Sequence, residues 1–212
     1  MNKKTWLIFC CLAIGIASYS IVQYLILDAH QAGFVSMKLM FINTLDSLWY
    51  TMLYTHIIYS VLALVIGPFT LFSKFRENNI KRHRILGKIY MIGIFFGSVS
   101  GLYLAFYATG GFVSQLGFST LSILWMITGY QAVVKIKEQK IYDHQKWMIR
   151  NYSLTFAAVT LRIWLLVFTV LFGFENFIIS YPIISWLCWV PNLIVAQWII
   201  QRKLQVSAQY IE

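Results

Sequence analysis

The sequence predicts an all-α integral membrane protein that crosses the bilayer six times. Three observations lead to this prediction: the composition is strongly apolar, charge-free runs long enough to cross a bilayer recur along the chain, and the basic residues gather between these runs. Hydrophobic residues make up 59% of the 212 residues and charged residues only 11%, against about 25% charged in a typical soluble domain. So little charge cannot cover a water-facing surface, and we expect lipid around most of the chain.

The charge-free runs define the expected spans, because a transmembrane helix needs about 20 consecutive apolar residues. The stretch between Lys88 and Lys135 carries no charge and is long enough for two spans, which Gly110 and Gly111 separate. The six expected spans lie at approximately residues 5–27, 48–73, 89–108, 112–134, 149–173 and 177–200. Backbone groups in lipid must bond to one another, so each span should be helical, and the runs lack the alternation of a β-barrel.

Irregular features are expected at a few positions along these spans. Pro68 should bend the second helix, and Pro182 and Pro191 should start and kink the last one. The segment 28–47 is expected to be a semi-apolar loop with a short helix on the membrane surface.

The basic residues predict the orientation. Nearly all of the 17 Lys and Arg residues flank the spans on one side, whereas Lys38 is the basic residue of the other side, together with Asp28, Asp46 and Glu175. Cytoplasmic loops carry the excess of Lys and Arg, so both termini are expected in the cytoplasm and the protein in the plasma membrane. The net charge of +10 is not a sign of nucleic-acid binding, because the charges form short clusters between apolar runs. These clusters contain Lys3, Lys4, Lys74, Arg76, Lys81, Arg82, Arg84, Lys88, Lys135, Lys137, Lys140, Lys146, Arg150, Arg202 and Lys203.

Two histidines occupy equivalent places in the basic loops. Ile80 precedes His83 by three residues and Ile141 precedes His144 by three, and each histidine sits next to a following span. Two histidines at one depth on neighbouring helices are what a bis-histidine haem b site needs. The alternative is that both cap helix starts or contact lipid phosphates.

Arg162 is the charge that lies deepest in the predicted membrane, about eleven residues or roughly 17 Å into its span. Arginine at that depth costs about 2.5–3.5 kcal/mol by insertion scales, and such a residue usually faces the protein interior. His56, with Tyr59 nearby, lies at a similar depth. Arg162, His56 and Tyr59 are therefore candidates for binding a quinone oxygen, a haem propionate or a carboxylate; the alternative for His56 is a structural hydrogen bond.

Gly93, Gly97 and Gly101 repeat at four-residue spacing in the third span, which favours close helix packing. A metal site is not expected, because Cys10, Cys11 and Cys188 lie within apolar runs without a CxxC spacing. The sequence also contains no Walker A, GxSxG or HExxH motif.

The order of several motifs resembles a bacterial membrane-protein family known as domain of unknown function 2306. The resemblance covers roughly residues 50–170 and rests on the residues His56, His83-Arg84-x-x-Gly87-Lys88-x-Tyr90, His144-x-x-Trp147-Met148-x-Arg150 and Thr160-Leu161-Arg162. It implies a four-helix core formed by spans two to five, with one extra helix at each end. The core is also broadly similar to that of b-type cytochromes, although the chain lacks the two histidines on each of two helices that a two-haem arrangement uses.

Three functions remain open from the sequence. The first is a membrane redox protein that holds a haem b or a quinone at His83 and His144, or at His56 and Arg162. The second is a transporter or small-molecule-binding protein with Arg162 as the anchor for an anion. The third is a non-catalytic accessory subunit of a membrane complex. The sequence leaves the oligomeric state and any enzymatic activity open.

Overall fold

The computed structural model describes residues 3–27, 33–39, 45–71 and 79–209 of the chain. Three charged residues used in the orientation prediction, Asp28, Lys74 and Arg76, lie outside the described residues.

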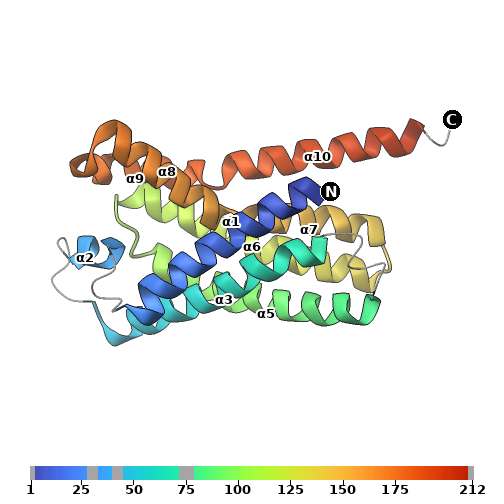
Figure 1. The fold of residues 1–212 in the computed structure, drawn as a ribbon, viewed down its shortest axis with the longest axis horizontal. Helices are drawn as coiled ribbons and strands as arrows, with labels where there is room; N and C mark the ends of the chain where they lie inside the picture. Colours follow the sequence, from blue (N-terminus) through green and yellow to red (C-terminus); the bar gives the residue numbers. More distant parts are fainter. Residues whose placement is uncertain (1–2, 28–32, 40–44, 72–78, 210–212) are drawn as a thin grey trace.

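The described residues are helical and contain no strand, as predicted (Figure 1). Six helical stretches are long and apolar enough to cross a membrane, which confirms the predicted number of spans within the described part of the chain. The elements are α1 (Lys3–Ile21) with a π-helical turn η1 (Val22–Ile26), α2 (Gly33–Leu39), α3 (Ser47–Leu71), α5 (Ile80–Ala105), α6 (Phe112–Lys137), α7 (Ile141–Thr155), α8 (Ala157–Phe172), the 3₁₀ turn η3 (Phe174–Asn176), α9 (Phe177–Leu187) and α10 (Val190–Gln209).

Two helices begin well before the apolar runs that predicted them. Helix α5 starts at Ile80 rather than at residue 89, and α7 starts at Ile141 rather than at residue 149. The side chain of Asn79 accepts a hydrogen bond from the backbone N–H of Arg82 at 3.0 Å, which caps the start of α5. Apolar run length marks only the lipid-buried part of a helix, so these polar first turns escaped the prediction.

Spans two to five form the predicted four-helix core. Helix α3 packs against α5, α5 against α6, α6 against α7, and α7 returns to α3. The interior of this ring holds buried aromatic and aliphatic side chains, among them Tyr90, Ile94, Trp125 and Tyr152. Helix α1 lies against α3 and α8, α9 against α6 and α8, and α10 against α7, so the first and last spans pack on the outside of the core (Figure 1).

Two of the six spans are broken. The fifth span is interrupted at Phe156, after which α8 leaves the core and packs against α9 and α1. The last span is interrupted between α9 and α10, and Pro191 is the second residue of α10, where the missing N–H of proline has little cost. Pro182 lies inside α9 and Pro68 inside α3.

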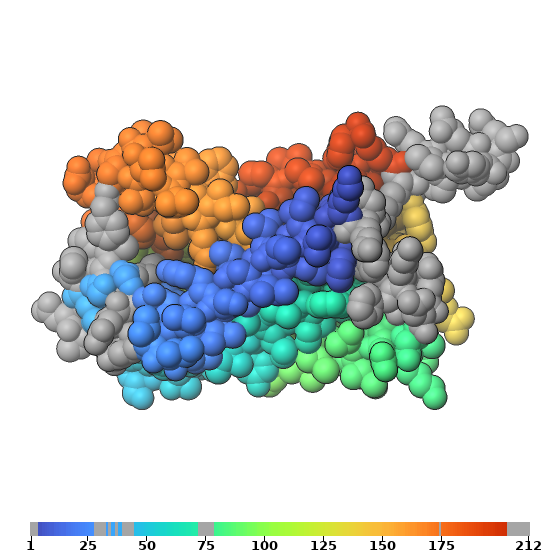
Figure 2. Space-filling view, in the orientation of Figure 1, coloured from blue at the N-terminus to red at the C-terminus, as the bar shows by residue number. Residues whose placement is uncertain are grey.

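The outer surface is apolar, as lipid contact requires. Figure 2 shows α1 lying across one face of the molecule, beside the α8–α9 pair and α10. Large hydrophobic side chains are exposed along these helices, for example Leu166, Val170 and Ile179 with 68%, 75% and 71% of their surface accessible. We call the end of the bundle where α5 and α7 start the basic end. The opposite end, with α2 and the α8–α9 turn, is called the distal end.

Candidate functional site

Arg162 is the sixth residue of α8 and reaches toward α1. Its Nη1 donates to the carbonyl of Ala158 at 2.7 Å, and its Nη2 donates to the hydroxyl of Ser20 at 3.1 Å. The guanidinium carbon lies 5.9 Å from the ring centre of Tyr19. Its Nε is buried without a hydrogen-bond partner in the described part of the chain. Ten residues separate Arg162 from the distal end of α8, so it lies about 15 Å from that end, which is half of a hydrocarbon core of about 30 Å.

Three further side chains lie within electrostatic range of this guanidinium: Tyr24, Tyr181 and His56. Tyr24 belongs to the π-helical turn after α1 and packs on the cluster of α3 residues that contains Leu53 and Ile57. π-helical turns occur frequently at functional sites. The Arg162 site thus draws on four elements: α1 with its π-helical turn, α3, α8 and α9.

His56 is fixed by a bond to the neighbouring helix. Its Nδ1 lies 2.8 Å from the carbonyl oxygen of Gly97 in α5. A carbonyl can only accept, so Nδ1 carries the proton, and in the neutral ring Nε2 is then a hydrogen-bond acceptor. Tyr59, the third predicted ligand residue, instead stacks on Phe96 of α5 with ring centres 4.8 Å apart. The structure therefore places His56 within electrostatic range of Arg162, with its ring bonded to α5, and places Tyr59 at the seam between α3 and α5.

The three glycines of α5, Gly93, Gly97 and Gly101, lie where neighbouring helices approach closely. A Cβ atom on each would come within 2.9 Å of a neighbouring atom. Those neighbours are the backbone oxygen of Tyr59 for Gly93, the ring of Trp125 for Gly97 and the imidazole of His56 for Gly101. The glycine stripe therefore fixes the position of the His56 ring as well as the approach of α5 to α3.

His83 and His144 are each the fourth residue of their helix, in α5 and α7. Both are half-buried. The Nδ1 of His144 lies 2.8 Å from the carbonyl oxygen of Ala132 in α6, so this nitrogen is the donor and Nε2 the acceptor. The described residues contain no cluster of three or more His, Cys, Asp or Glu side chains that suits a metal ion. Haem ligation by the two histidines stays a prediction.

A buried polar network in the core was missed by the sequence analysis. The hydroxyl of Tyr90 donates to Asn151 Oδ1 at 2.7 Å and lies 3.0 Å from the hydroxyl of Thr155. Trp125 Nε1 donates to the same Thr155 hydroxyl at 2.8 Å, and Asn151 Nδ2 donates to the Trp125 carbonyl and to the hydroxyl of Thr128. Tyr90 and Asn151 have no accessible surface. One feature of the sequence could have revealed this network: Asn151 lies inside a predicted span, where an amide without hydrogen-bond partners is costly.

A second polar cluster joins the two broken spans at their breaks. The hydroxyl of Thr160 in α8 donates to the carbonyl of Cys188, which lies in the break of the last span. Asn192 Nδ2 donates to the Ser153 carbonyl at 3.2 Å and to the Thr160 hydroxyl at 3.1 Å. These bonds satisfy backbone groups that the breaks release, and they tie α8 to the start of α10.

Comparison with known proteins gives the family. The sequence model of the family described as predicted membrane protein (DUF2306) matches residues 53–200. The chain belongs to this family. The match confirms the resemblance and extends it through most of the last span. Comparisons with curated proteins and with solved structures find no match.

The DUF2306 match includes some parts of the Arg162 site and not others. Arg162, His56 and Tyr181 lie within the matched residues, as do the polar network and the breaks of the last two spans. Ser20, Tyr19 and Tyr24 lie before them, in α1 and its π-helical turn. In this chain the helix preceding the match therefore supplies a hydrogen-bond partner of Arg162, Ser20, and a ring beside its guanidinium, Tyr19.

Proposed function

We propose that this DUF2306 protein binds a small molecule with a carboxylate or carbonyl oxygen at Arg162, inside the membrane, and that it acts as a transporter or binding protein for that molecule. The observation that carries the proposal is the state of Arg162. Its charge lies near the middle of a span, no ion pair of the described residues includes it, and its buried Nε has no partner. A charge kept there at a cost of about 2.5–3.5 kcal/mol calls for a function.

The surroundings of Arg162 suit a ligand that both accepts and donates hydrogen bonds. Arg162 offers N–H donors in a planar fork, and His56 offers the acceptor Nε2. A carboxylic acid, a hydroxy acid or a quinol fits such a pair, because each carries an acceptor oxygen and an exchangeable proton. The two broken spans add support, since transporters often build midplane sites from discontinuous helices.

Binding to the purified protein in lipid nanodiscs tests this proposal. The midpoint temperature of thermal unfolding would be measured in the presence of acetate, benzoate, inorganic phosphate or a short-chain benzoquinone, with chloride as the reference. We expect at least one of the four probes to raise the midpoint of the wild type and none to raise that of Arg162→Leu. Arg162→Lys should respond weakly because lysine lacks the planar fork. An equal response of wild type and Arg162→Leu to every probe refutes Arg162 as the anchor.

A second candidate function is haem b binding at His83 and His144, in a membrane redox protein. It is favoured by the bond from His144 Nδ1 to the Ala132 carbonyl, because ligating histidines typically donate one ring N–H to a carbonyl and bind metal with the other nitrogen. The absorption spectrum of the purified protein decides this candidate. A Soret band that is lost in both His83→Ala and His144→Ala supports it, and a colourless wild type refutes it.

We also propose that both termini face the cytoplasm, with the protein in the plasma membrane. The basic end carries Lys135, Lys137 and Lys140 near one turn, as cytoplasmic loops do. A cysteine at Glu175 should react with an impermeant thiol reagent on intact cells, and a cysteine at Gln139 only after permeabilisation. The reverse labelling pattern would show that both termini face away from the cytoplasm.

A further inference from the structure

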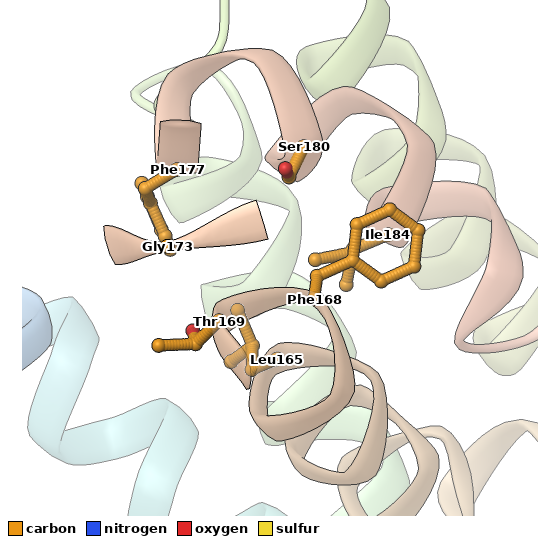
Figure 3. A pocket seen from close by; sticks show the side chains of 7 residues that line it. All are labelled: Leu165, Phe168, Thr169, Gly173, Phe177, Ser180 and Ile184. Carbon is orange, nitrogen blue, oxygen red and sulfur yellow. The ribbon is translucent and has the colours of Figure 1, made fainter. Parts of the chain in front are cut away.

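The hollow between α8 and α9 at the distal end is small (Figure 3). Apolar side chains line most of it, among them Leu165, Phe168 and Ile184. It has room for about one water molecule, whereas a pocket that encloses a small ligand measures roughly 300–1,000 Å³. The hollow therefore does not enclose a ligand, and the outer surface at the basic end offers better contacts for one.

Arg150 is half-buried at the junction of α7 and α10. Its guanidinium carbon lies 4.7 Å from the ring centre of Trp147, one turn earlier in α7. Its Nε and Nη2 donate to the side-chain oxygen of Gln197 in α10, at 3.3 and 2.9 Å. No ion pair of the described residues includes Arg150. A ring and an amide thus hold this cation in place without neutralising its charge.

Two N–H groups of the Arg150–Gln197 pair remain for a ligand. A guanidinium can only donate, so the oxygen of the Gln197 amide faces Arg150 and its Nε2 group points elsewhere. Neither Arg150 Nη1 nor Gln197 Nε2 bonds to another described residue. Gln197 is exposed, and Arg150 Nη1 is not a buried atom. A phosphate group suits such donors, because its oxygens accept several charge-assisted hydrogen bonds.

Arg150 lies at the depth of lipid phosphates. It precedes Arg162 by twelve residues along the fifth span, or roughly 18 Å at about 1.5 Å per residue. With Arg162 near the middle of the membrane, this is slightly more than the half-thickness of about 15 Å of the hydrocarbon core. Tryptophan is typical of this level. Helix α10 has a similar pair there, because the guanidinium carbon of Arg202 lies 3.6 Å from the ring centre of Trp198.

The surface on either side of the pair suits an anionic lipid. Toward the membrane, Ile194 lies one turn before Gln197 on the same side of α10 and is 65% exposed, so an acyl chain can lie against it. Toward the water, Lys146 lies one turn before Arg150 and pairs with Asp143 at 2.9 Å, which neutralises that carboxylate. The uncompensated charge of Arg150 attracts a phosphate and repels the ammonium of a zwitterionic headgroup.

We propose that Arg150 and Gln197 bind the phosphate of an anionic membrane phospholipid at the junction of α7 and α10, with an acyl chain along α10. The site is separate from Arg162, and the proposal does not depend on the function proposed there. A lipid bound in this way contacts both helices and ties the last span to the four-helix core.

Binding of short-chain lipids to the purified protein in a maltoside detergent tests the site. Dihexanoyl phosphatidylglycerol and dihexanoyl phosphatidylcholine would be titrated separately. We expect the wild type to bind the phosphatidylglycerol about tenfold more tightly and Arg150→Gln to lose this preference. Arg84→Gln is the matched control, because it removes the same charge from an exposed arginine at the basic end, and it should keep the preference. The proposal is overturned if the wild type has no preference, if Arg150→Gln keeps it, or if both variants lose it equally.

Glycerol phosphate separates a lipid from a free phosphate, because it carries the headgroup chemistry without acyl chains. It should compete with the phosphatidylglycerol only weakly, at concentrations about tenfold higher or more. Competition at equal concentrations would show that the acyl chains contribute nothing, and the ligand would then be a soluble phosphate rather than a lipid.

Two glutamines of α10 give a second comparison that leaves every charge in place. Gln197→Leu removes the amide that holds Arg150, and Gln201→Leu makes the same change at an exposed position one turn further along. We expect Gln197→Leu to lose most of the preference for phosphatidylglycerol and Gln201→Leu to keep it. This pair decides the site if Arg150→Gln does not fold. A preference kept by both variants would show that Gln197 takes no part, and the site as proposed would be wrong.

Discussion

The hydroxyl of Tyr152 in α7 donates a hydrogen bond to the backbone carbonyl of Leu64 in α3, at 3.3 Å. Leu64 lies four residues before Pro68, which has no N–H to bond that carbonyl within the helix. The Tyr152 ring also occupies the space beside Gly67, where any side chain would collide with it. A tyrosine from the fifth span thus supplies the bond that the proline of the second span removes.

This relationship predicts a coupling between Tyr152 and Pro68. Tyr152→Phe should lower the free energy of unfolding by about 1 kcal/mol, because a buried carbonyl loses its partner. In a Pro68→Ala background the restored N–H bonds Leu64, so the same change should cost much less. A double-mutant cycle by denaturant titration in detergent measures the difference. Additive effects of the two changes would show that the Tyr152 hydroxyl does not replace the hydrogen bond that Pro68 denies to the Leu64 carbonyl.

The glycine stripe of α5 offers a matched pair of substitutions. In Gly97→Ala the new Cβ would lie 2.9 Å from the Trp125 ring and 3.1 Å from the Ser60 hydroxyl, so we expect a loss of about 1–3 kcal/mol from overpacking. Gly87 lies in the same helix with no atom within 4 Å of its Cβ position. Gly87→Ala should therefore stabilise by about 0.5–1 kcal/mol. Thermal midpoints in one detergent compare the two variants, and a harmless Gly97→Ala would contradict the close approach of α5 to α6.

The spans could be predicted from the sequence because lipid imposes a long apolar run on every crossing helix. Their ends could not, since the first turns of α5 and α7 are polar, and apolar run length registers neither these turns nor the Asn79 cap at the start of α5. The breaks at Phe156 and between α9 and α10 also left little trace beyond Pro191.

The site was predictable in part. That Arg162 and His56 lie well inside their helices followed from counting residues along the chain. The direct partners did not, because Ser20 and Tyr19 are more than 130 residues away in sequence and only tertiary packing brings α1 to α8. The core network was unpredictable for the same reason, since Tyr90 and Asn151 are separated by 61 positions in the sequence and meet only in the folded protein.

The core network predicts a large effect of Asn151. Asn151→Leu leaves the Tyr90 hydroxyl and the Thr128 hydroxyl without their amide partner in a site with no accessible surface. We expect a loss of about 2–3 kcal/mol. Tyr90→Phe removes one hydroxyl of the network and should cost less, about 1 kcal/mol. The unfolding free energies of both variants, measured in the same detergent, test the order. A smaller loss of unfolding free energy for Asn151→Leu than for Tyr90→Phe would contradict the inference that the Asn151 amide contributes most to the network.

Lys38 predicts a dependence of α2 docking on pH. Its Nζ donates to the backbone carbonyl of Tyr107 and lies 5.8 Å from the ring centre of Trp49, and the residue is only 3% exposed. Burial lowers the pKa of the Lys38 ammonium to about 8, from an ordinary value of 10.5. Below pH 8 the lysine is charged whether or not α2 is docked, so docking bears the full cost of burying the charge. As the pH rises from 8 toward 10.5 the docked lysine loses its proton first, and docking becomes more stable.

Hydrogen–deuterium exchange of the α2 amides, corrected for intrinsic exchange rates, measures this dependence. We expect stronger protection at pH 9.5 than at pH 7 in the wild type. Lys38→Met removes the buried ammonium, so its protection at pH 7 should already match that of the wild type at pH 9.5 and should not change with pH. Lys88→Met, at an exposed lysine of α5, is the control and should behave as the wild type. If Lys38→Met shows the same rise in protection as the wild type, another group carries the pH dependence, and the burial of the Lys38 ammonium does not limit the docking of α2.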